Sequence, residues 1–181
     1  MLALPEELPT EPLSILRNWL EGARADDSIP NPDAMALATV DAAGQPANRV
    51  VLCKELAEPG YIVFYTNYES LKARNIEDNA RVAGVFHWDH LNRQARFEGV
   101  AVRSPDSESD AYFDSRDKES QVGAWTSSQS SPVESRRALM TKHMNTARRL
   151  ADLEAETGRD SIPRPPSWGG YRIWLSAVEL W

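Results

Sequence analysis

The sequence predicts a mainly β domain with peripheral helices, an α+β fold built on an antiparallel sheet. Between residues 35 and 102, short β-branched and aromatic runs alternate with connections rich in turn-forming residues. Connections of this length suit antiparallel strands, because a parallel pair needs a longer crossover. Segments with helical periodicity precede and follow this β region. The chain of 181 residues is long enough for one domain with its own core.

The N-terminal part should contain a flexible arm, residues 1–9, followed by a single domain over residues 10–181. Thr10 is a candidate helix cap, with Pro12 in the first turn. Apolar residues then recur at helical spacing: Leu13, Leu16, Leu20 and Ala23.

The β region should hold five strands, at residues 35–40, 48–56, 61–65, 81–86 and 94–102. The turn-forming sequence at 57–60 joins the second and third of these strands into a hairpin. A short helix follows at about 71–77, and Asn67 is its expected cap. This arrangement places Ser70 and Lys72 in the first turn, where free backbone N–H groups favour an anion.

The C-terminal part should be mostly helical before a last strand. Ser104-Pro105 opens one helix, and a polar loop with aromatic residues is expected from 112 to 131. The capping box Ser131-Pro-Val-Glu134 predicts a second helix that ends near residue 155. Its expected apolar stripe is Met140, Met144, Ala147 and Ala151.

A proline-rich connector at 161–167 leads to a final alternating strand, residues 171–181. That strand finishes on Trp181 without a polar tail. We therefore expect further residues beyond Trp181 in the natural protein, or completion of the strand by a partner chain.

Composition narrows the classes of function. A net charge of −7 argues against binding to nucleic acid or to an anionic membrane surface. No apolar stretch approaches the ~20 residues needed to span a bilayer, and the first residues lack the features of a secretion signal. A cytoplasmic location is the resulting expectation.

The sequence does not indicate a reactive cysteine, a metal site or a glycine-rich nucleotide-binding loop. The single cysteine, Cys53, lies in a predicted buried strand and is interpreted as a small hydrophobic residue. His87 and His90 resemble a metal pair, but no third ligand stands at a recognisable spacing, so a polar turn is expected and no metal is assigned. Glycine-rich dinucleotide and phosphate-loop fingerprints are missing from the sequence. A nucleotide-like cofactor would therefore have to be held by side chains.

The stretch Arg49-Val-Val-Leu-Cys-Lys54, followed by Phe64-Tyr-Thr-Asn67 and Ser70-x-Lys72, provides cations and hydroxyls at the ends of two strands. These groups suit a phosphorylated ligand. In a regular strand Arg49 and Lys54 point to opposite faces. Either a bulge brings them to one phosphate, or each serves a different ligand.

A second group lies in the polar loop. Tyr112, Arg116 and Ser120 are closely spaced and precede Trp125. This combination can bind a phosphate and an aromatic ring together. A flexible serine-rich linker is the simpler alternative.

Taken in order, these blocks resemble the pyridoxamine 5'-phosphate oxidase family over about residues 12–181. The matching motifs are Arg49-Val-Val-Leu-x-Lys54, Phe64-Tyr-Thr-Asn67, Ser70-x-Lys72, Arg93-Gln94, Tyr112-Phe-x-Ser-Arg116, Ser120-Gln-x-Gly-Ala-Trp125, Ser128-Gln-Ser-Ser131 and Trp168-Gly-Gly-Tyr-Arg172. The resemblance implies an antiparallel split β-barrel homodimer that binds FMN between its subunits.

The resemblance also implies residue roles. The residues implied for FMN are Arg49, Val50, Val51, Leu52, Lys54, Tyr65, Thr66, Lys72, Gln94, Gln129, Ser130 and Trp181. Those implied for the substrate phosphate are Lys54, Tyr112, Arg116 and Ser120. The implied reaction oxidises pyridoxamine or pyridoxine 5'-phosphate to pyridoxal 5'-phosphate by hydride transfer to the flavin, with O2 as acceptor and H2O2 as product. No side chain is assigned as a catalytic nucleophile or base.

The sequence departs from the family pattern at three places. Leu71 stands where the family usually has arginine. The N-terminal arm lacks the basic and tyrosine residues that some members fold over the substrate, and the chain ends at Trp181, before an Arg-x-His-x-Arg segment. Two alternatives therefore stay open: a related flavin oxidase for another small aromatic substrate, such as a phenazine-type precursor, and a non-catalytic module that binds FMN or pyridoxal phosphate.

Overall fold

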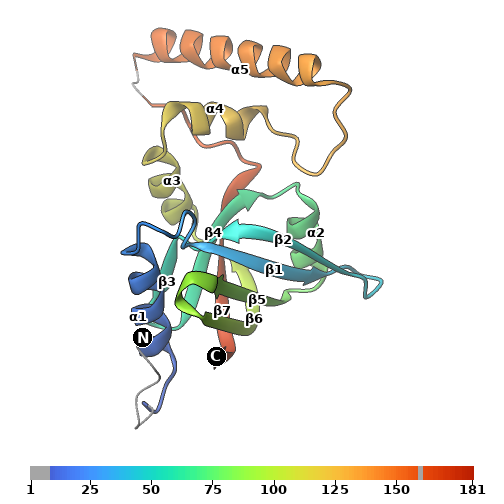
Figure 1. Ribbon diagram of the computed structural model, residues 1–181. Coiled ribbons are helices and arrows are strands. Elements are labelled where there is room, and N and C mark those ends of the chain that lie inside the picture. The colour runs from blue at the N-terminus through green and yellow to red at the C-terminus, as the bar shows by residue number, and fades with distance from the viewer. Residues whose placement is uncertain (1–8, 159–160) are drawn as a thin grey trace. The chain divides into compact units, whose positions relative to one another are not determined.

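The computed structural model describes residues 9–158 and 161–181 (Figure 1). The first eight residues of the predicted flexible arm lie outside this described part. A seven-stranded sheet has the order β2-β1-β5-β6-β7-β4-β3. Its strands are β1 (Ala34–Val40), β2 (Pro46–Leu52), β3 (Glu55–Ala57), β4 (Tyr61–Asn67), β5 (Arg81–Trp88), β6 (Arg93–Arg103) and β7 (Trp168–Leu180).

The sheet is antiparallel at each pair whose register is defined: β1 with β2, β1 with β5, β3 with β4, and β5 with β6. The predicted antiparallel fold is therefore confirmed. The strand at the C-terminal end, β7, lies between β6 and β4 in the sheet order. A segment distant in sequence thus completes the sheet.

The chain divides into two compact units. Unit 1 comprises the chain up to Phe64 together with Asn75–Val102 and Tyr171–Trp181, and unit 2 comprises Tyr65–Arg74 and Arg103–Gly170. Strands β4, β6 and β7 and helix α2 (Leu71–Asp78) pass from one unit to the other. The expectation of a single domain over residues 10–181 stays a prediction.

In unit 1, helix α1 (Leu13–Arg24) buries the predicted face. Leu16, Leu20 and Ala23 are almost fully buried, and Trp19 joins them, whereas Leu13 is partly exposed. The predicted cap is wrong. Pro12 occupies the N-cap position, and the carboxylate of Glu11 accepts the N–H groups of residues 13 and 14, at 2.7 and 3.2 Å. A carboxylate can accept two backbone donors at once, which a threonine hydroxyl does less well.

The predicted strand 48–56 is two strands, β2 and β3, separated at Cys53 and Lys54. The Cys53 N–H donates to the carbonyl of Asp33 at 2.8 Å, and the Lys54 N–H donates to the carbonyl of Val63 at 2.8 Å. The chain therefore changes its partner strand at this point. The predicted 57–60 turn is confirmed by the Gly60 N–H, which donates to the Ala57 carbonyl at 2.9 Å. Gly60 has φ +89°, a conformation that favours glycine.

Unit 2 contains helices α3 (Asp106–Asp114), α4 (Lys118–Thr126) and α5 (Arg136–Thr157). Their common core consists of Phe113, Val122, Ala124, Leu150, Ile162 and Trp168. Helix α4 lies in the segment expected to be a loop, so that expectation is wrong. Asp117 caps this helix by accepting the Ser120 N–H at 2.8 Å.

Helix α5 also differs from the expectation. It begins at Arg136, and its cap is Ser135, whose hydroxyl accepts the Ala138 N–H at 3.1 Å, so Ser131 is not the cap. The predicted apolar stripe is wrong at Met140 and Met144, which are 50% and 67% exposed, and at the exposed Ala151, whereas Ala147 packs against the core of unit 2. The buried positions are Thr146 and Leu150, since the packing of α5 selects the face that carries Leu150.

Candidate functional site

A buried ammonium group lies at the start of α2 in unit 2. Lys72 is 7% exposed, and its Nζ donates to three oxygen atoms. These are Oε1 of Gln129 at 2.6 Å, Oγ1 of Thr66 at 3.0 Å and Oγ of Ser70 at 3.3 Å. The Thr66 hydroxyl donates to the same Gln129 oxygen at 3.2 Å. Three residues predicted to bind the cofactor, Thr66, Lys72 and Gln129, are thus brought together.

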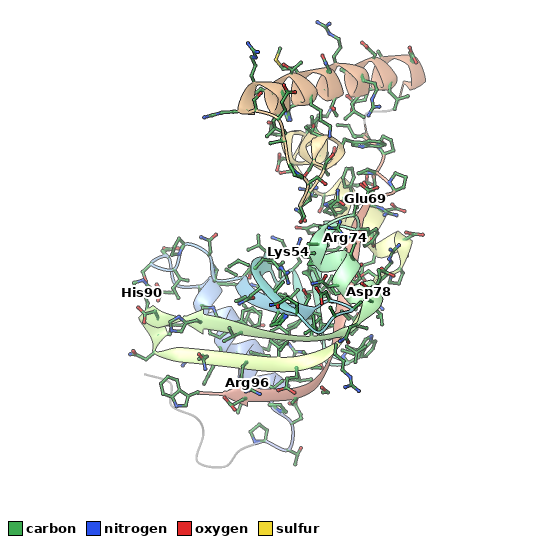
Figure 2. The ribbon with its side chains drawn as sticks, turned by 90° about the vertical axis from the view of Figure 1, so that its right-hand side faces the viewer. Lys54, Glu69, Arg74, Asp78, His90 and Arg96 are labelled. Atoms are coloured by element: carbon green, nitrogen blue, oxygen red, sulfur yellow. The ribbon has the colours of Figure 1, made fainter. Side chains whose placement is uncertain are left out.

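The local sequence explains this cluster. Ser70 caps α2, because its hydroxyl accepts the Ala73 N–H at 3.4 Å. Asn67, the predicted cap, instead accepts the Glu69 N–H at 2.6 Å and donates its amide to the Ser127 carbonyl at 3.2 Å. That second bond holds the segment that precedes Gln129. Figure 2 labels Glu69 and Arg74 at this end of α2, where Arg74 donates to the Glu69 carbonyl.

Gln129 and Ser130 form the centre of a turn. The Ser131 N–H donates to the Ser128 carbonyl at 3.2 Å, and Ser130 has φ +64°. A non-glycine residue with positive φ is uncommon and often occurs at a functional site. The turn presents the Gln129 side chain to Lys72, and Ser130 itself is exposed.

A second cluster of unit 2 is aromatic and cationic. Tyr65 stacks on Tyr112 with ring centroids 3.9 Å apart and on Trp168 at 5.4 Å. The guanidinium carbon of Arg116 lies 4.7 Å from the centre of a Trp168 ring. Its Nη1 atom is buried and has no hydrogen-bond partner among the described residues. Burial lowers the pKa of Arg116 from its ordinary value. A cation in this state suits an anionic ligand that carries an aromatic ring.

Ser120 lies in the first turn of α4, but its hydroxyl is already used. Its Oγ donates to Oδ2 of Asp117 at 2.8 Å, in addition to the backbone bond to Oδ1. The bonds from Ser120 lower the pKa of the Asp117 carboxyl. To donate to a substrate phosphate, this hydroxyl would have to leave Asp117. The role predicted for Ser120 therefore stays a prediction. The Asp117 carboxylate would compete with a substrate phosphate for its hydroxyl.

In unit 1, Arg49 lies on the edge strand β2, opposite Leu37 on β1. Its Nη1 donates to the Thr39 hydroxyl at 2.7 Å and to the carbonyls of Leu37 and Ala47 at 3.1 and 3.0 Å. Burial lowers the pKa of Arg49 from its ordinary value. The Asn75 amide also donates to the Thr39 hydroxyl, at 3.0 Å. Thr39 therefore links the guanidinium to α2.

The other predicted residues of β2 alternate between two faces. Val51 lies on the face that carries Arg49, whereas Val50 and Leu52, 65% and 41% exposed, lie on the other. Lys54 lies in the break between β2 and β3, and its side chain is exposed (Figure 2). The strand break accounts for the different environments of Arg49 and Lys54.

Gln94 and Trp181 form a directly opposed pair in unit 1. The Gln94 N–H donates to the Trp181 carbonyl at 2.7 Å, and the Trp181 N–H donates back at 2.8 Å. Residues that exchange both bonds carry their side chains on one face of the sheet. The Trp181 side chain is 80% exposed. Two predicted cofactor residues are thus adjacent.

Two other groups considered in the sequence analysis, His90 and Cys53, lie in a turn and in the core, respectively. His90 lies in a single 3-10 turn, Asp89–Leu91, at the end of the β5–β6 hairpin (Figure 2). Across the residues that the structure describes, no group of three metal-ligating side chains is present. Cys53 is fully buried, and this burial raises the pKa of its thiol to about 12. None of the described helices has both the length and the hydropathy that crossing a membrane requires.

Sequence reasoning assigned no role to three residues of these clusters: Thr39 and Asn75, which it did not single out, and Trp168, which it named only within the motif Trp168-Gly-Gly-Tyr-Arg172. Thr39 and Asn75 give no local signal, because their importance comes from the contact with Arg49. Trp168 did have a signal. It precedes Gly169 and Gly170, where an added Cβ would overlap the Tyr68 hydroxyl and would lie 2.9 Å from the Tyr65 ring, respectively.

Comparisons with known proteins agree with this fold. A family model described as pyridoxamine 5'-phosphate oxidase matches residues 23–155. Pyridoxine/pyridoxamine 5'-phosphate oxidase from Rubrobacter xylanophilus is 47% identical over 172 residues, which cover 94% of this chain and 75% of that protein. The protein of the same name from Shewanella halifaxensis is 41% identical over 176 residues, covering 97% and 79%.

Two solved structures are also similar. PhzG from Burkholderia lata, in complex with tetrahydrophenazine-1-carboxylic acid, has a TM-score of 0.86 at 27% identity, covering 99% of this chain and 85% of that one. A pyridoxamine 5'-phosphate oxidase-related, FMN-binding protein from Nostoc punctiforme has a TM-score of 0.68 at 19% identity, covering 95% and 84%. The second likeness concerns the fold alone.

The antiparallel seven-stranded sheet with its helices is a split-barrel fold of the oxidase-like class. The chain belongs to the pyridoxamine 5'-phosphate oxidase family.

Proposed function

We propose that this protein oxidises pyridoxamine 5'-phosphate or pyridoxine 5'-phosphate to pyridoxal 5'-phosphate, with O2 as acceptor and H2O2 as product. Its family supports a flavin oxidoreductase of this type. The observation on which the choice of substrate rests is Arg116, whose buried Nη1 has no hydrogen-bond partner in the described part of the chain. It lies against the ring of Trp168, close to the stacked Tyr65 and Tyr112. A phosphate attached to an aromatic ring would satisfy both features.

FMN is the cofactor that the family and the fold class support. The residues of unit 2 fit its phosphate, because Lys72 brings a buried positive charge together with the hydroxyls of Thr66 and Ser70. When bound, FMN supplies the acceptor for a hydride and passes the electrons to O2. We propose that the residues implied by the family resemblance line it: Arg49, Val50, Val51, Leu52, Lys54, Tyr65, Thr66, Lys72, Gln94, Gln129, Ser130 and Trp181.

The chain itself would bind and orient the substrate. Arg116 neutralises phosphate charge, and Tyr112, stacked on Tyr65, limits the space beside it. Lys54 has an exposed ammonium group that can move to meet a ligand. Ser120 would contribute its hydroxyl only after releasing Asp117. Positioning of this kind can supply a large part of a rate enhancement without a protein nucleophile.

We also propose that the protein is a homodimer with FMN between the subunits. One face of the sheet in unit 1 supports this. Val50 lies opposite Ala36, and Ala36 lies opposite Val85, so apolar side chains run across three strands. Val50 is 65% exposed and Val100, on the same face of β6, is 43% exposed. Sedimentation of the wild type should give twice the chain mass, and Val100→Glu should shift it to the monomer. A cytoplasmic location stays a prediction.

One observation favours a second candidate, oxidation of another small aromatic acid. PhzG, whose structure contains a phenazine carboxylic acid, is similar over 99% of this chain. A carboxylate can also pair with Arg116. The two candidates differ in the anion, so the preference between a phosphorylated and a carboxylated substrate separates them.

The experiment is an anaerobic titration of the FMN-loaded protein, followed by visible absorption. Pyridoxamine 5'-phosphate should bleach the flavin band, and air should restore it with release of H2O2. Bleaching by tetrahydrophenazine-1-carboxylic acid, and none by the phosphorylated amine, would replace the first candidate by the second. If neither compound reduces the flavin, the result would favour the remaining alternative, a non-catalytic module that binds FMN.

A further inference from the structure

Trp168 holds a central place in the aromatic cluster of unit 2. It is 7% exposed and lies at the start of β7. Phe113 packs edge-on against it with ring centroids 5.3 Å apart, and Tyr65 stacks on it. Its backbone is fixed as well, because its carbonyl accepts from Arg164 at 2.6 Å and its N–H donates to the Pro165 carbonyl at 3.0 Å. The indole therefore has little freedom to move.

The two glycines that follow Trp168 allow this packing. A Cβ on Gly170 would lie 2.6 Å from the Ser104 hydroxyl and 2.9 Å from the Tyr65 ring. A Cβ on Gly169 would overlap the Tyr68 hydroxyl. Any larger residue would force these groups away from the start of β7. The lack of a side chain at Gly170 thus leaves room for the Tyr65 ring that stacks on Trp168.

Arg116 depends on this arrangement. Its guanidinium lies over the Trp168 ring at 4.7 Å and farther from Phe113, at 5.8 Å. One nitrogen, Nη1, is buried and has no hydrogen-bond partner among the described residues. An aromatic face attracts a guanidinium and holds its plane without using its N–H groups. The N–H groups of Nη1 are then left for an anion.

We propose that Trp168 is a positioning residue that holds Arg116 ready for the phosphate of the substrate, and so sets the preference for phosphorylated over unphosphorylated substrate. This inference rests on the proposed function. It adds a residue that does not itself bind the phosphate. Leucine at position 168 should fill much of the space but leave Arg116 without an aromatic face, whereas phenylalanine should retain part of it.

The test compares the dissociation constants of pyridoxamine and pyridoxamine 5'-phosphate, measured by anaerobic calorimetry on the protein loaded with reduced FMN, which cannot oxidise either compound. The ratio of the two constants reports phosphate recognition alone. Trp168→Leu should lower this ratio about tenfold, since a positioned charge-assisted bond is lost, and Trp168→Phe should recover part of it. In an Arg116→Ala background, Trp168→Leu should cause no further change in the ratio.

The matched control is Trp19→Leu. Trp19 lies in α1 of unit 1, is 6% exposed, and has a guanidinium, that of Arg93, 4.9 Å from its ring. This variant should keep the wild-type ratio. A second readout does not need the substrate: the Arg116 side-chain N–H signal in NMR should show a ring-current shift that disappears in Trp168→Leu.

The outcomes separate the inference from the proposed function. A wild type without any preference for the phosphorylated amine would overturn both. The role of Trp168 alone would be overturned by either of two results. Trp168→Leu could keep the wild-type preference, or it could lower the ratio by the same factor in the Arg116→Ala background as in the wild type. A lower ratio, together with the disappearance of the ring-current shift of the Arg116 signal in a folded Trp168→Leu variant, would support this role.

Discussion

The ammonium of Lys72 lies 2.6 Å from Oε1 of Gln129, a residue 57 positions later in the chain. Gln129 follows α4, and Lys72 lies in the first turn of α2. The contact therefore joins a helix start to a turn that carries a positive φ at Ser130. Neutral oxygen atoms thus hold the buried cation in place. An anionic oxygen is a stronger acceptor and can replace them.

Replacing this cation should weaken FMN binding. Lys72→Met removes a charge-assisted bond worth about 1.5–3 kcal/mol, so the FMN dissociation constant should rise about tenfold or more. Fluorescence titration of FMN measures it. Lys142→Met is the control, because Lys142 is exposed and donates to Ser128 in the same unit. Equal affinity in the Lys72 variant and the wild type would remove Lys72 from the cofactor site.

Adding a cation next to Lys72 should have the opposite effect. Leu71 is 43% exposed in the first turn of α2, where the family usually has arginine. Leu71→Arg should tighten FMN binding up to about fivefold, since an exposed ion pair contributes about 0.2–1 kcal/mol, and the gain should shrink at high salt. Leu139→Arg makes the same change at a 40% exposed leucine of α5 and should leave the affinity unchanged. An equal gain in both variants would show a non-specific charge effect.

Removing Arg116 should affect the substrate and spare the cofactor. Arg116→Ala should raise KM for pyridoxamine 5'-phosphate about tenfold or more, with FMN retained, because a charge-assisted bond to phosphate is lost. Steady-state kinetics and the flavin spectrum give the two quantities. Arg148→Ala, at an exposed position of α5, serves as the control. Loss of FMN with unchanged substrate affinity would reverse the assignment.

Cys53 should be unreactive in the folded protein. With a pKa of about 12 and no exposed surface, only about one thiol in 10,000 is ionised at pH 8. Iodoacetamide should therefore label the native protein far more slowly than the urea-unfolded chain, and the rate should rise as the pH approaches 12. Rapid native labelling at pH 8 would show that the β2–β3 junction opens readily.

Two glycine substitutions should have opposite effects on stability. A Cβ at Gly99 would overlap the Trp174 carbonyl oxygen, so Gly99→Ala should lower the free energy of unfolding by about 1–3 kcal/mol. Gly123 lies inside α4, and an added methyl group would meet no side chain or neighbouring element within 4 Å. Gly123→Ala should therefore raise the free energy of unfolding by about 0.5–1 kcal/mol. Urea titrations of both variants measure the two changes. Destabilisation by the second substitution would mean that α4 needs flexibility at this position.

Much of the fold could be predicted because strand and turn signals are local. The hairpin around Gly60 follows from residues that lie within ten positions of one another. The errors fall where several local choices were possible. Glu11, Ser70 and Ser135 cap helices that Thr10, Asn67 and Ser131 could also have capped. The structure chooses between neighbouring caps by the position at which each helix packs.

Helix α5 shows the same limit of sequence-based prediction in the choice of the face that is buried. Its sequence offers a stripe through Met140 and Met144, yet these residues are exposed and Leu150 is buried. Apolar periodicity identifies a helix, but the partner surface decides which side is covered. The core of unit 2 accepts Leu150 beside Val122 and Trp168.

The sequence alone determined the antiparallel sheet, the family resemblance and the set of candidate ligand-binding residues, because these depend on residue type and order. Tertiary structure decided which of those residues meet. Lys72 and Gln129, or Arg116 and Trp168, are separated by more than fifty positions along the chain, and no local signal specifies such contacts. Tertiary structure also decided which groups are already occupied, such as the Ser120 hydroxyl at Asp117. The physical reason is that hydrogen bonding and burial depend on neighbours in space, which only folding brings together.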